Sequence, residues 1–307
     1  MANKFMGASL YVPANHKNLL AIANGELLPN ARSLIFCTED AVSEEALGYA
    51  LFNLQLTLEN MHPSCRTDRF VRVRNTDVLK RVLAMHGSEK LTGFVIPKAS
   101  AENFHDYFDM LRDTKHLLMP TLETAEVFCD DAMRDLRSIL LAPEVKPRIL
   151  ALRIGGNDLL ALLGLRRPRS VSIYQTPLGS VIAKLVIIFK PHGFELTAPV
   201  FEYLDLPELL DQEVIQDLAH GLVGKTAIHP DQIEEIECHY RVSNSDMESA
   251  SAILNVNSPA VFKMHNAMCE IATHKAWAIR TLERSELFGQ HSHEASRPVN
   301  EEQNASY

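Results

Sequence analysis

The 307-residue sequence has little of what marks membrane, secreted or nucleic-acid-binding proteins. Its most apolar run, VIAKLVIIF (181–189), is far shorter than the roughly 20 residues that cross a bilayer. The N-terminal MANKFMGASLYVPANHK lacks the apolar length of a signal peptide. Basic residues are outnumbered by acidic ones, and the net charge of -9 does not favour non-specific binding to nucleic acid or to an anionic membrane. We therefore expect a globular cytoplasmic protein with neither nucleic-acid nor membrane partners.

Cysteine pairs and metal-binding histidine pairs are also missing. The five cysteines are scattered and include no C-x-x-C, which is typical of reduced thiols in the cytoplasm. None of the 13 histidines forms an H-x-x-x-H pair, so we expect no zinc site of that type. Hydrophobic residues make up 46% of the chain, enough for one large domain or two ordinary ones.

Short apolar runs alternate with longer segments of helical periodicity along the first 240 or so residues. Several runs are continuously apolar, as in strands buried on both faces of a parallel sheet. The runs are SLYV, SLIFC, RFVRVR, GFVIP, HLLMP, RILALRI, FELTAPV and GKTAIHP. About eight such units predict an α/β protein, a (β/α)8 TIM barrel rather than an open doubly wound sheet. PLGSVIAKLVIIFKPHG predicts an extra helix between the sixth and seventh strands.

These patterns predict a barrel catalytic domain over residues 1–241. After Arg241 the pattern is only helical, which predicts a C-terminal helical extension over 242–288, acting as a lid or oligomerisation segment. Residues 289–307 are polar and predict a disordered tail. The extension carries apolar residues that a complete barrel does not need, which favours a homo-oligomer: Val261, Phe262, Met264, Met268, Ile271, Trp277, Ile279 and Leu282.

A barrel places its active site at the C-terminal ends of its strands, where this sequence is rich in charged residues. Glu123 and Asp158 follow the fifth and sixth strands, and paired carboxylates of this kind suit Mg2+. Asn157 or Asp158 could instead cap the following helix. Arg72 and Arg74 offer guanidinium groups for a substrate carboxylate or an enolate oxygen.

Three further charged residues lie at predicted strand ends. Glu39 and Asp40 could act directly in catalysis, or could orient Arg72 and metal-bound water. Lys98 follows a proline at a strand end and is a candidate substrate-binding residue.

Two other motifs have competing interpretations. LRRPRS (165–170) is either a solvated loop or a site for carboxylates or phosphates. AHGLVGKT (219–226) is close to a phosphate-binding loop, but a helical segment precedes it, where that motif needs a strand.

Ordered motifs from Ser9 to Ile236 resemble the citrate lyase β-subunit family, also called the HpcH/HpaI aldolase/citrate lyase superfamily, which includes malyl-CoA lyases. The motifs are SLYVPAN, SLIFCTEDAV, VRVRN, GFVIPKA, PTLETAE, RIGGNDLLALLG and GKTAIHPDQI. The resemblance implies a (β/α)8 barrel and a Mg2+-dependent carbon–carbon lyase. Its substrate would be a hydroxy acid or 2-oxo acid, free or as a CoA thioester, that reacts through an enolate.

The resemblance also assigns roles to residues. Arg72 matches the substrate-binding arginine, Glu123 the acid that binds Mg2+ and substrate, and Asp158 the second metal-binding acid. A trimer or hexamer is implied as well.

Two departures suggest a divergent branch. Cys37 stands where the second-strand motif usually has Asp, and Asn266 stands where many members have a lid Asp. Because an amide cannot act as a general base, the usual thioester chemistry is less secure than the metal site. A non-catalytic or regulatory protein that binds a metal or a carboxylate is the alternative.

Overall fold

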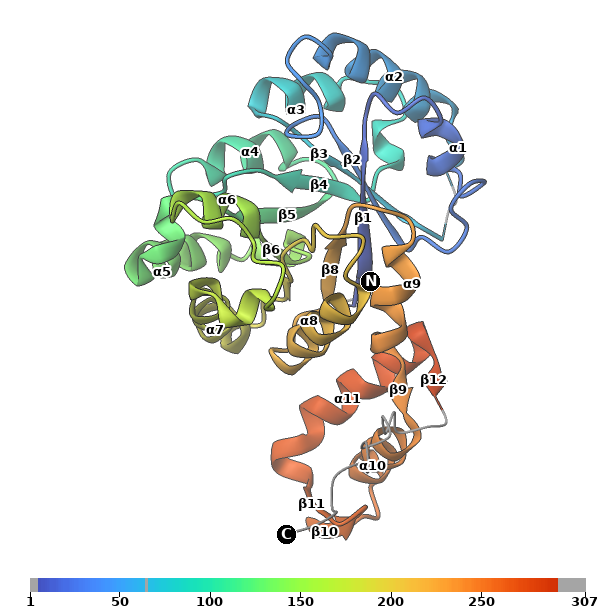
Figure 1. Cartoon of the computed structure of the whole chain (residues 1–307), viewed down its shortest axis with the longest axis vertical. Helices are drawn as coiled ribbons and strands as arrows, with labels where there is room; N and C mark the ends of the chain where they lie inside the picture. Colours follow the sequence, from blue (N-terminus) through green and yellow to red (C-terminus); the bar gives the residue numbers. More distant parts are fainter. Residues whose placement is uncertain (1–4, 64–65, 292–307) are drawn as a thin grey trace, which may run out of the picture. The chain divides into compact units, whose positions relative to one another are not determined.

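The computed structural model describes residues 5–63 and 66–291, which form two compact units, 5–236 and 237–291. The first unit contains eight parallel strands in the order β7-β6-β5-β4-β3-β2-β1-β8 (Figure 1). The strands are β1 (Gly7–Pro13), β2 (Ser33–Cys37), β3 (Asp68–Arg72), β4 (Gly93–Ile96), β5 (Leu117–Leu122), β6 (Leu152–Ile154), β7 (Leu196–Thr197) and β8 (Gly224–Ala227).

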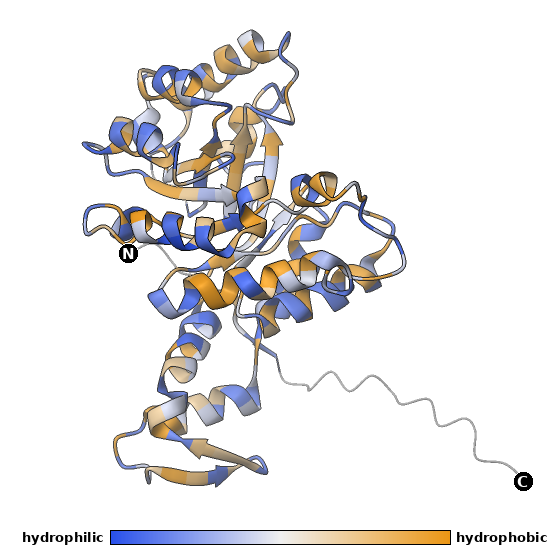
Figure 2. Ribbon diagram, turned by 90° about the vertical axis from the view of Figure 1, so that its left-hand side faces the viewer, coloured by the Kyte–Doolittle hydropathy of each residue, from blue (hydrophilic) through white to orange (hydrophobic). Residues whose placement is uncertain are grey.

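Backbone hydrogen bonds between the two ends of this sheet bring it close to a closed barrel. The Val223 N–H donates to the Leu196 carbonyl at 2.9 Å, and the Ala198 N–H donates to the Gly224 carbonyl at 2.7 Å. The predicted TIM barrel is therefore confirmed. Its strands are largely hydrophobic (Figure 2), and every residue of β2 and β4 is buried, as in a sheet covered on both faces.

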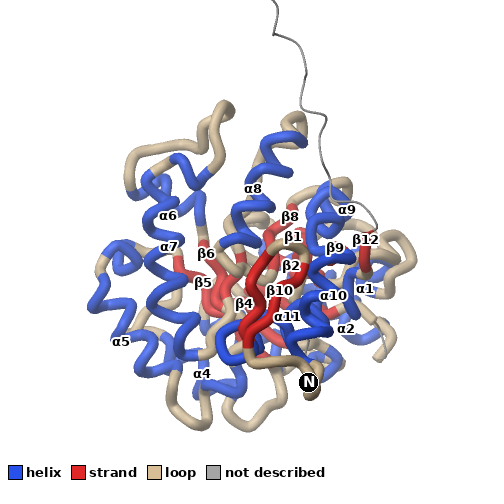
Figure 3. Tube along the Cα trace, turned by 90° about the horizontal axis from the view of Figure 1, so that it is seen from below, coloured by secondary structure: helices blue, strands red, loops and turns tan. Residues whose placement is uncertain are grey.

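Helices cover the outside of the strands (Figure 3). They are α1 (Leu19–Ala23), α2 (Leu47–Asn60), α3 (Thr76–Leu83), α4 (Phe104–Leu111), α5 (Asp130–Leu140), α6 (Gly156–Leu162), α7 (Pro177–Phe189), α8 (Pro207–Ala219) and α9 (Gln232–Glu237). The predicted extra helix between the sixth and seventh strands is α7. Pro177 occupies its first turn, and the Thr176 hydroxyl caps it by accepting the Leu178 N–H at 3.2 Å. No helix within residues 5–63 and 66–291 is long and apolar enough to cross a membrane.

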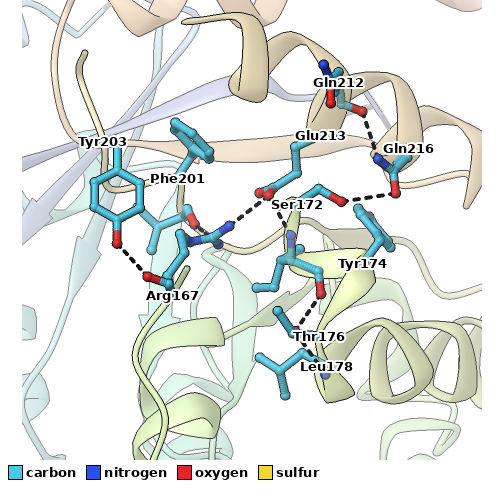
Figure 4. A network of polar contacts seen from close by, with 12 residues as sticks. Arg167, Ser172, Tyr174, Thr176, Leu178, Phe201, Tyr203, Gln212, Glu213 and Gln216 are labelled. Atoms are coloured by element: carbon cyan, nitrogen blue, oxygen red, sulfur yellow. Dashed lines mark hydrogen bonds and ion pairs between the residues drawn. The ribbon is translucent and has the colours of Figure 1, made fainter. Parts of the chain in front are cut away.

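A buried ionic network joins α8 to β8 and to the loop after α6. Glu213 accepts hydrogen bonds from Lys225 Nζ at 2.9 Å and from Arg167 Nη1 at 2.7 Å, and Lys225 also reaches Asp217 at 2.9 Å. Figure 4 shows the contact between Arg167 and Glu213. Lys225 is fully buried, so the lysine of the GKT motif is a structural residue that cannot reach a phosphate. Within LRRPRS, Arg167 is buried and meets a carboxylate, whereas the Arg166 side chain is exposed.

The second unit differs from the predicted all-helical pattern. It contains α10 (Asn244–Leu254) and α11 (Ile271–Phe288), but residues 261–270 form an antiparallel hairpin of β10 (Val261–Met264) and β11 (Ala267–Glu270). A short parallel pair joins β9 (Val242–Ser243) to β12 (Gln290–His291). Gln290 and His291 therefore lie in a strand, and the rest of the predicted disordered tail, 292–307, lies outside the described residues.

The hairpin turn consists of His265 and Asn266, which have φ angles of 47° and 60°. Positive φ at both central residues is the pattern of the two-residue turn that matches the twist of a hairpin, and asparagine tolerates it well. Short 3-10 helices complete the fold at Ser88–Lys90, Ala125–Phe128, Lys146–Arg148, Ile173–Gln175, Lys190–His192 and Cys238–Tyr240.

Candidate active site

The C-terminal ends of the strands enclose a cavity of about 260 Å³. Four of the predicted site residues line it: Asp40, Arg72, Glu123 and Asp158. Arg72 is the last residue of β3, and Glu123 directly follows β5. Since the carboxyl ends of parallel strands meet at one end of a barrel, residues far apart in the sequence converge here.

Arg72 is the centre of a group of buried charges. Its Nη2 atom forms an ion pair with Glu39 and lies 3.1 Å from Asp40 Oδ2 and 3.2 Å from Glu123 Oε1. Burial alone would lower the pKa of Arg72, but Tyr11, Glu123 and Glu39 together raise it, so the guanidinium remains charged. One guanidinium nitrogen therefore serves three carboxylates, which leaves an excess of negative charge around it.

Glu123 is held by a strained backbone as well as by Arg72. The N–H of Lys98 donates to Glu123 Oε1 at 2.8 Å. Lys98 has a φ of 48°, a conformation that non-glycine residues rarely adopt and that often occurs at functional sites. The pKa of Glu123 is raised to about 7, mainly by burial and also by the charges of Asp158 and Glu39, while Arg72 and the Lys98 N–H oppose the shift.

Asp158 lies in the first turn of α6, which follows β6 after a single residue, Gly155. The N-terminal cap of α6 is Gly155, and no side chain caps the helix, so the interpretation of Asn157 or Asp158 as the helix cap is wrong. Asp158 instead lines the cavity, and burial together with the charge of Asp40 raises its pKa. Strands β5 and β6 are neighbours (Figure 1), and Asp158 and Glu123 line the same cavity.

Gly155 makes room for this arrangement. A Cβ atom at Gly155 would lie 2.4 Å from Glu123 Cβ and 2.6 Å from Glu123 Oε2, closer than real Cβ contacts come. The glycine is thus required by the position of the Glu123 carboxylate rather than by its own backbone angles.

The donor set fits Mg2+. Two carboxylates that line one cavity and that both have a raised pKa are stabilised by a divalent cation, and Mg2+ prefers one or two carboxylates completed by water or substrate oxygens. In the part of the chain that the structure describes, no group of three histidine, cysteine or acidic side chains could form a complete metal site on its own. Mg2+ held by Glu123 and Asp158 would therefore need further oxygen ligands, such as water or substrate.

Three residues singled out in the sequence have no direct chemical role in this structure: Arg74, Lys98 and Cys37. Arg74 donates to the backbone carbonyls of Thr38, Glu39 and Val42, so it supports the loop that carries the acids. The Lys98 side chain is largely exposed, with Nζ 3.7 Å from Glu39 Oε1. Cys37 lines the cavity, but burial raises the pKa of its thiol, which makes it a poor nucleophile.

Tyr11 and Arg153 are cavity residues that the sequence did not predict. Tyr11 lies on β1, and its ring centre is 6.0 Å from Arg72 Cζ and 5.4 Å from Arg153 Cζ. Arg153 lies on β6 within the apolar run RILALRI, the same setting that marked Arg72 within RFVRVR. An arginine inside an apolar run is therefore the sequence pattern from which Arg153 could have been predicted. A tyrosine in a strand does not by itself indicate a site.

Comparison with known proteins agrees with this geometry. The family described as C–C bond lyase of the TIM-barrel fold matches residues 1–290. A (3S)-malyl-CoA thioesterase of Cereibacter sphaeroides is 29% identical over 248 residues, 79% of each chain.

Solved structures share the fold. The protein CitE of Mycobacterium tuberculosis, in complex with magnesium, acetoacetate and coenzyme A, superposes with a TM-score of 0.69 at 21% identity, covering 92% of this chain and 98% of that one. The citrate lyase beta subunit of M. tuberculosis with oxaloacetate and magnesium gives 0.59 at 22% identity, covering 78% and 100%. With a family match that covers nearly the whole sequence, the chain belongs to the C–C bond lyases of the TIM-barrel fold.

Proposed function

We propose that the protein is a Mg2+-dependent carbon–carbon lyase that acts on a hydroxy acid or 2-oxo acid, free or as a CoA thioester. The observation that carries this proposal is the meeting of Glu123, Asp158 and Arg72 at one cavity. The cavity of about 260 Å³ is smaller than the roughly 300–1,000 Å³ of sites that enclose a drug-sized ligand. It therefore suits a small acid, with any CoA portion outside the barrel.

Each group in the cavity has a part in this chemistry. Mg2+ held by Glu123 and Asp158 would act as a Lewis acid toward a substrate oxygen. Arg72 stabilises the negative charge that develops on the enolate oxygen as the carbon–carbon bond breaks. Asp40, whose side chain is mostly exposed and which lines the cavity, is placed to accept the substrate hydroxyl proton. Glu39 is buried against Arg72 and keeps the guanidinium in position.

Similar proteins support the substrate class. The relatives include a malyl-CoA thioesterase, and the solved neighbours were obtained with magnesium and with acetoacetate, coenzyme A or oxaloacetate. Hydrolysis of a thioester is therefore the second reaction to test, because a thioesterase releases CoA and leaves the carbon skeleton intact.

A product assay on the purified protein with Mg2+ separates the possibilities. We expect malyl-CoA, citramalyl-CoA or a free 2-oxo acid to yield two smaller carbon fragments. Release of CoA with an intact acid would identify a thioesterase instead. Binding of these compounds without turnover of any of them would support the non-catalytic alternative.

Arg72→Lys is the informative variant in that assay. Lysine keeps the charge but not the planar group that contacts several carboxylates, so kcat/KM should fall by about 100-fold with the fold intact. Arg148→Lys is the matched control, because Arg148 is bound to the carbonyls of His116 and Leu111 and does not line the cavity. Near-native activity of Arg72→Lys would remove Arg72 from the mechanism.

A further inference from the structure

Arg153 is a second cation in the cavity, and its surroundings differ from those of Arg72. It is the middle residue of β6 and is 2% exposed. Its Nη2 donates to Thr226 Oγ1 at 2.6 Å, its Nη1 lies 3.9 Å from Met119 Sδ, and its Cζ lies 5.4 Å from the Tyr11 ring centre. All three partners are neutral, and within residues 5–63 and 66–291 no carboxylate pairs with Arg153.

A buried guanidinium without a counterion is unfavourable for folding, because its charge loses the solvation of water and gains little in return. Arg167, another buried arginine, pairs with the carboxylate of Glu213 at 2.7 Å. A role in stability alone therefore does not account for Arg153. A ligand that brings a negative charge into the cavity does.

The position of Arg153 shows where that charge would lie. Arg72 is paired with Glu39, Asp40 and Glu123. Arg153 instead contacts Met119, which lies on β5 four residues before Glu123. Both guanidinium groups lie near the same Tyr11 ring and both line the cavity, so one small molecule can reach both.

We propose that Arg153 is a specificity-determining residue that binds a second carboxylate of the substrate, away from the carboxylates that hold the metal. The inference rests on the proposed function and narrows it to hydroxy or 2-oxo acids that carry two free carboxylates. A planar guanidinium binds a carboxylate through two parallel hydrogen bonds, which gives both affinity and selection by geometry.

Calorimetry with oxaloacetate and pyruvate in the presence of Mg2+ tests the inference, since the two acids differ by one carboxylate group. Wild-type protein should bind oxaloacetate about 10- to 100-fold more tightly, the range for a hydrogen-bonded charged group. Arg153→Met should lose this preference while its affinity for pyruvate stays within about twofold. Arg153→Lys should retain part of the preference. Arg148→Met, the control away from the cavity, should retain all of it.

The failures of the two proposals are distinguishable. Equal binding of both acids to wild-type protein, or an unchanged preference in folded Arg153→Met, would overturn the role of Arg153 alone. If Arg153→Met does not fold, an unchanged preference in Arg153→Lys has the same consequence. Absence of Mg2+-dependent binding of either acid to wild-type protein would overturn the proposed function and this inference with it. Asp158→Asn should lose both acids, unlike either Arg153 variant.

Discussion

Glu123 is the residue whose chemistry depends most on its surroundings. Its pKa is raised to about 7, mainly by burial. Among the groups that face it, Arg72 and the Lys98 N–H stabilise the ionised carboxylate, whereas the charges of Asp158 and Glu39 destabilise it. In the metal-free protein the raised pKa makes ionisation costly, so this group lowers stability as the pH rises from the ordinary glutamate range through about 7. A bound divalent cation would reverse that effect by stabilising the ionised form.

Mg2+ affinity should accordingly rise with pH through about 7 and then level off. A protonated carboxyl is a poor ligand, so binding at one unit below the pKa should be about tenfold weaker than the plateau. Calorimetric titrations with Mg2+ at several pH values measure this directly. No histidine lines the cavity in the described residues, so this titration reports the raised pKa values of the two proposed ligands, Glu123 and Asp158. An affinity that is constant across this range would contradict the assigned role.

At the residue scale, the sequence identified charged residues whose position at predicted strand ends indicates a site. Arg72, Glu123 and Asp158 lie in motifs at predicted strand ends, and all three line the cavity. Arg153 was not predicted, because it lies in the middle of β6 rather than after the end of a strand, where the site residues were expected. The strained backbone of Lys98, which places an N–H on Glu123, could not be predicted, because nothing in a lysine indicates a positive φ.

The β6–α6 junction shows how an element positions the site. Gly155→Ala would place a methyl group 2.4 Å from Glu123 Cβ, so the carboxylate must move. We expect at least tenfold weaker Mg2+ binding with the barrel still folded, measured by calorimetry and circular dichroism. Gly48→Ala is the matched control: its Cβ meets nothing within 4 Å, and alanine in a helix such as α2 is neutral or stabilising. Unchanged Mg2+ binding in Gly155→Ala would contradict the described position of Glu123.

The hairpin β10–β11 is the element that the sequence did not predict. Apolar residues spaced through 261–271 fit a helical face, and the turn residues His265 and Asn266 include no glycine to mark a hairpin. The barrel strands were easier to predict, because continuously apolar runs between helical segments have few other interpretations.

Asn266→Asp tests whether the lid has lost a base. Aspartate tolerates the same positive φ as asparagine, so the hairpin should persist and any change in rate should report chemistry. If residue 266 corresponds to the lid Asp of the citrate lyase β-subunit family, turnover of malyl-CoA or citramalyl-CoA should rise tenfold or more. Strong wild-type activity that neither Asn266 nor His265 substitutions reduce would show that this segment does not correspond to the lid.

At the scale of the whole molecule, the family match extends through the C-terminal unit to residue 290. That unit has a small core of Ala250, Ile253, Cys269 and Ala278. Three of the apolar residues that suggested an oligomer pack against it, namely Phe262, Met264 and Leu282. Four others remain exposed in the single chain: Val261, Met268, Trp277 and Ile279.

We predict that these exposed residues contact another copy of the chain in a homotrimer or homohexamer. Replacing Met268 and Trp277 together by glutamate should lower the mass in light scattering to that of a monomer at micromolar concentration, because buried charge destabilises an apolar interface. Ile187→Glu is the control, since Ile187 is equally apolar and 72% exposed on α7. A monomeric wild-type protein would contradict the prediction.

Mg2+ binding by Glu123 and Asp158 is the claim on which the proposed chemistry rests. Isothermal calorimetry of Mg2+ with wild-type protein, Glu123→Gln and Asp158→Asn, each checked for folding by thermal denaturation, tests it most directly. Wild-type protein should bind Mg2+, and each variant should bind at least about 100-fold more weakly, because an amide replaces one of only two charged ligands. Mg2+ binding that is unchanged in both folded variants would contradict the site.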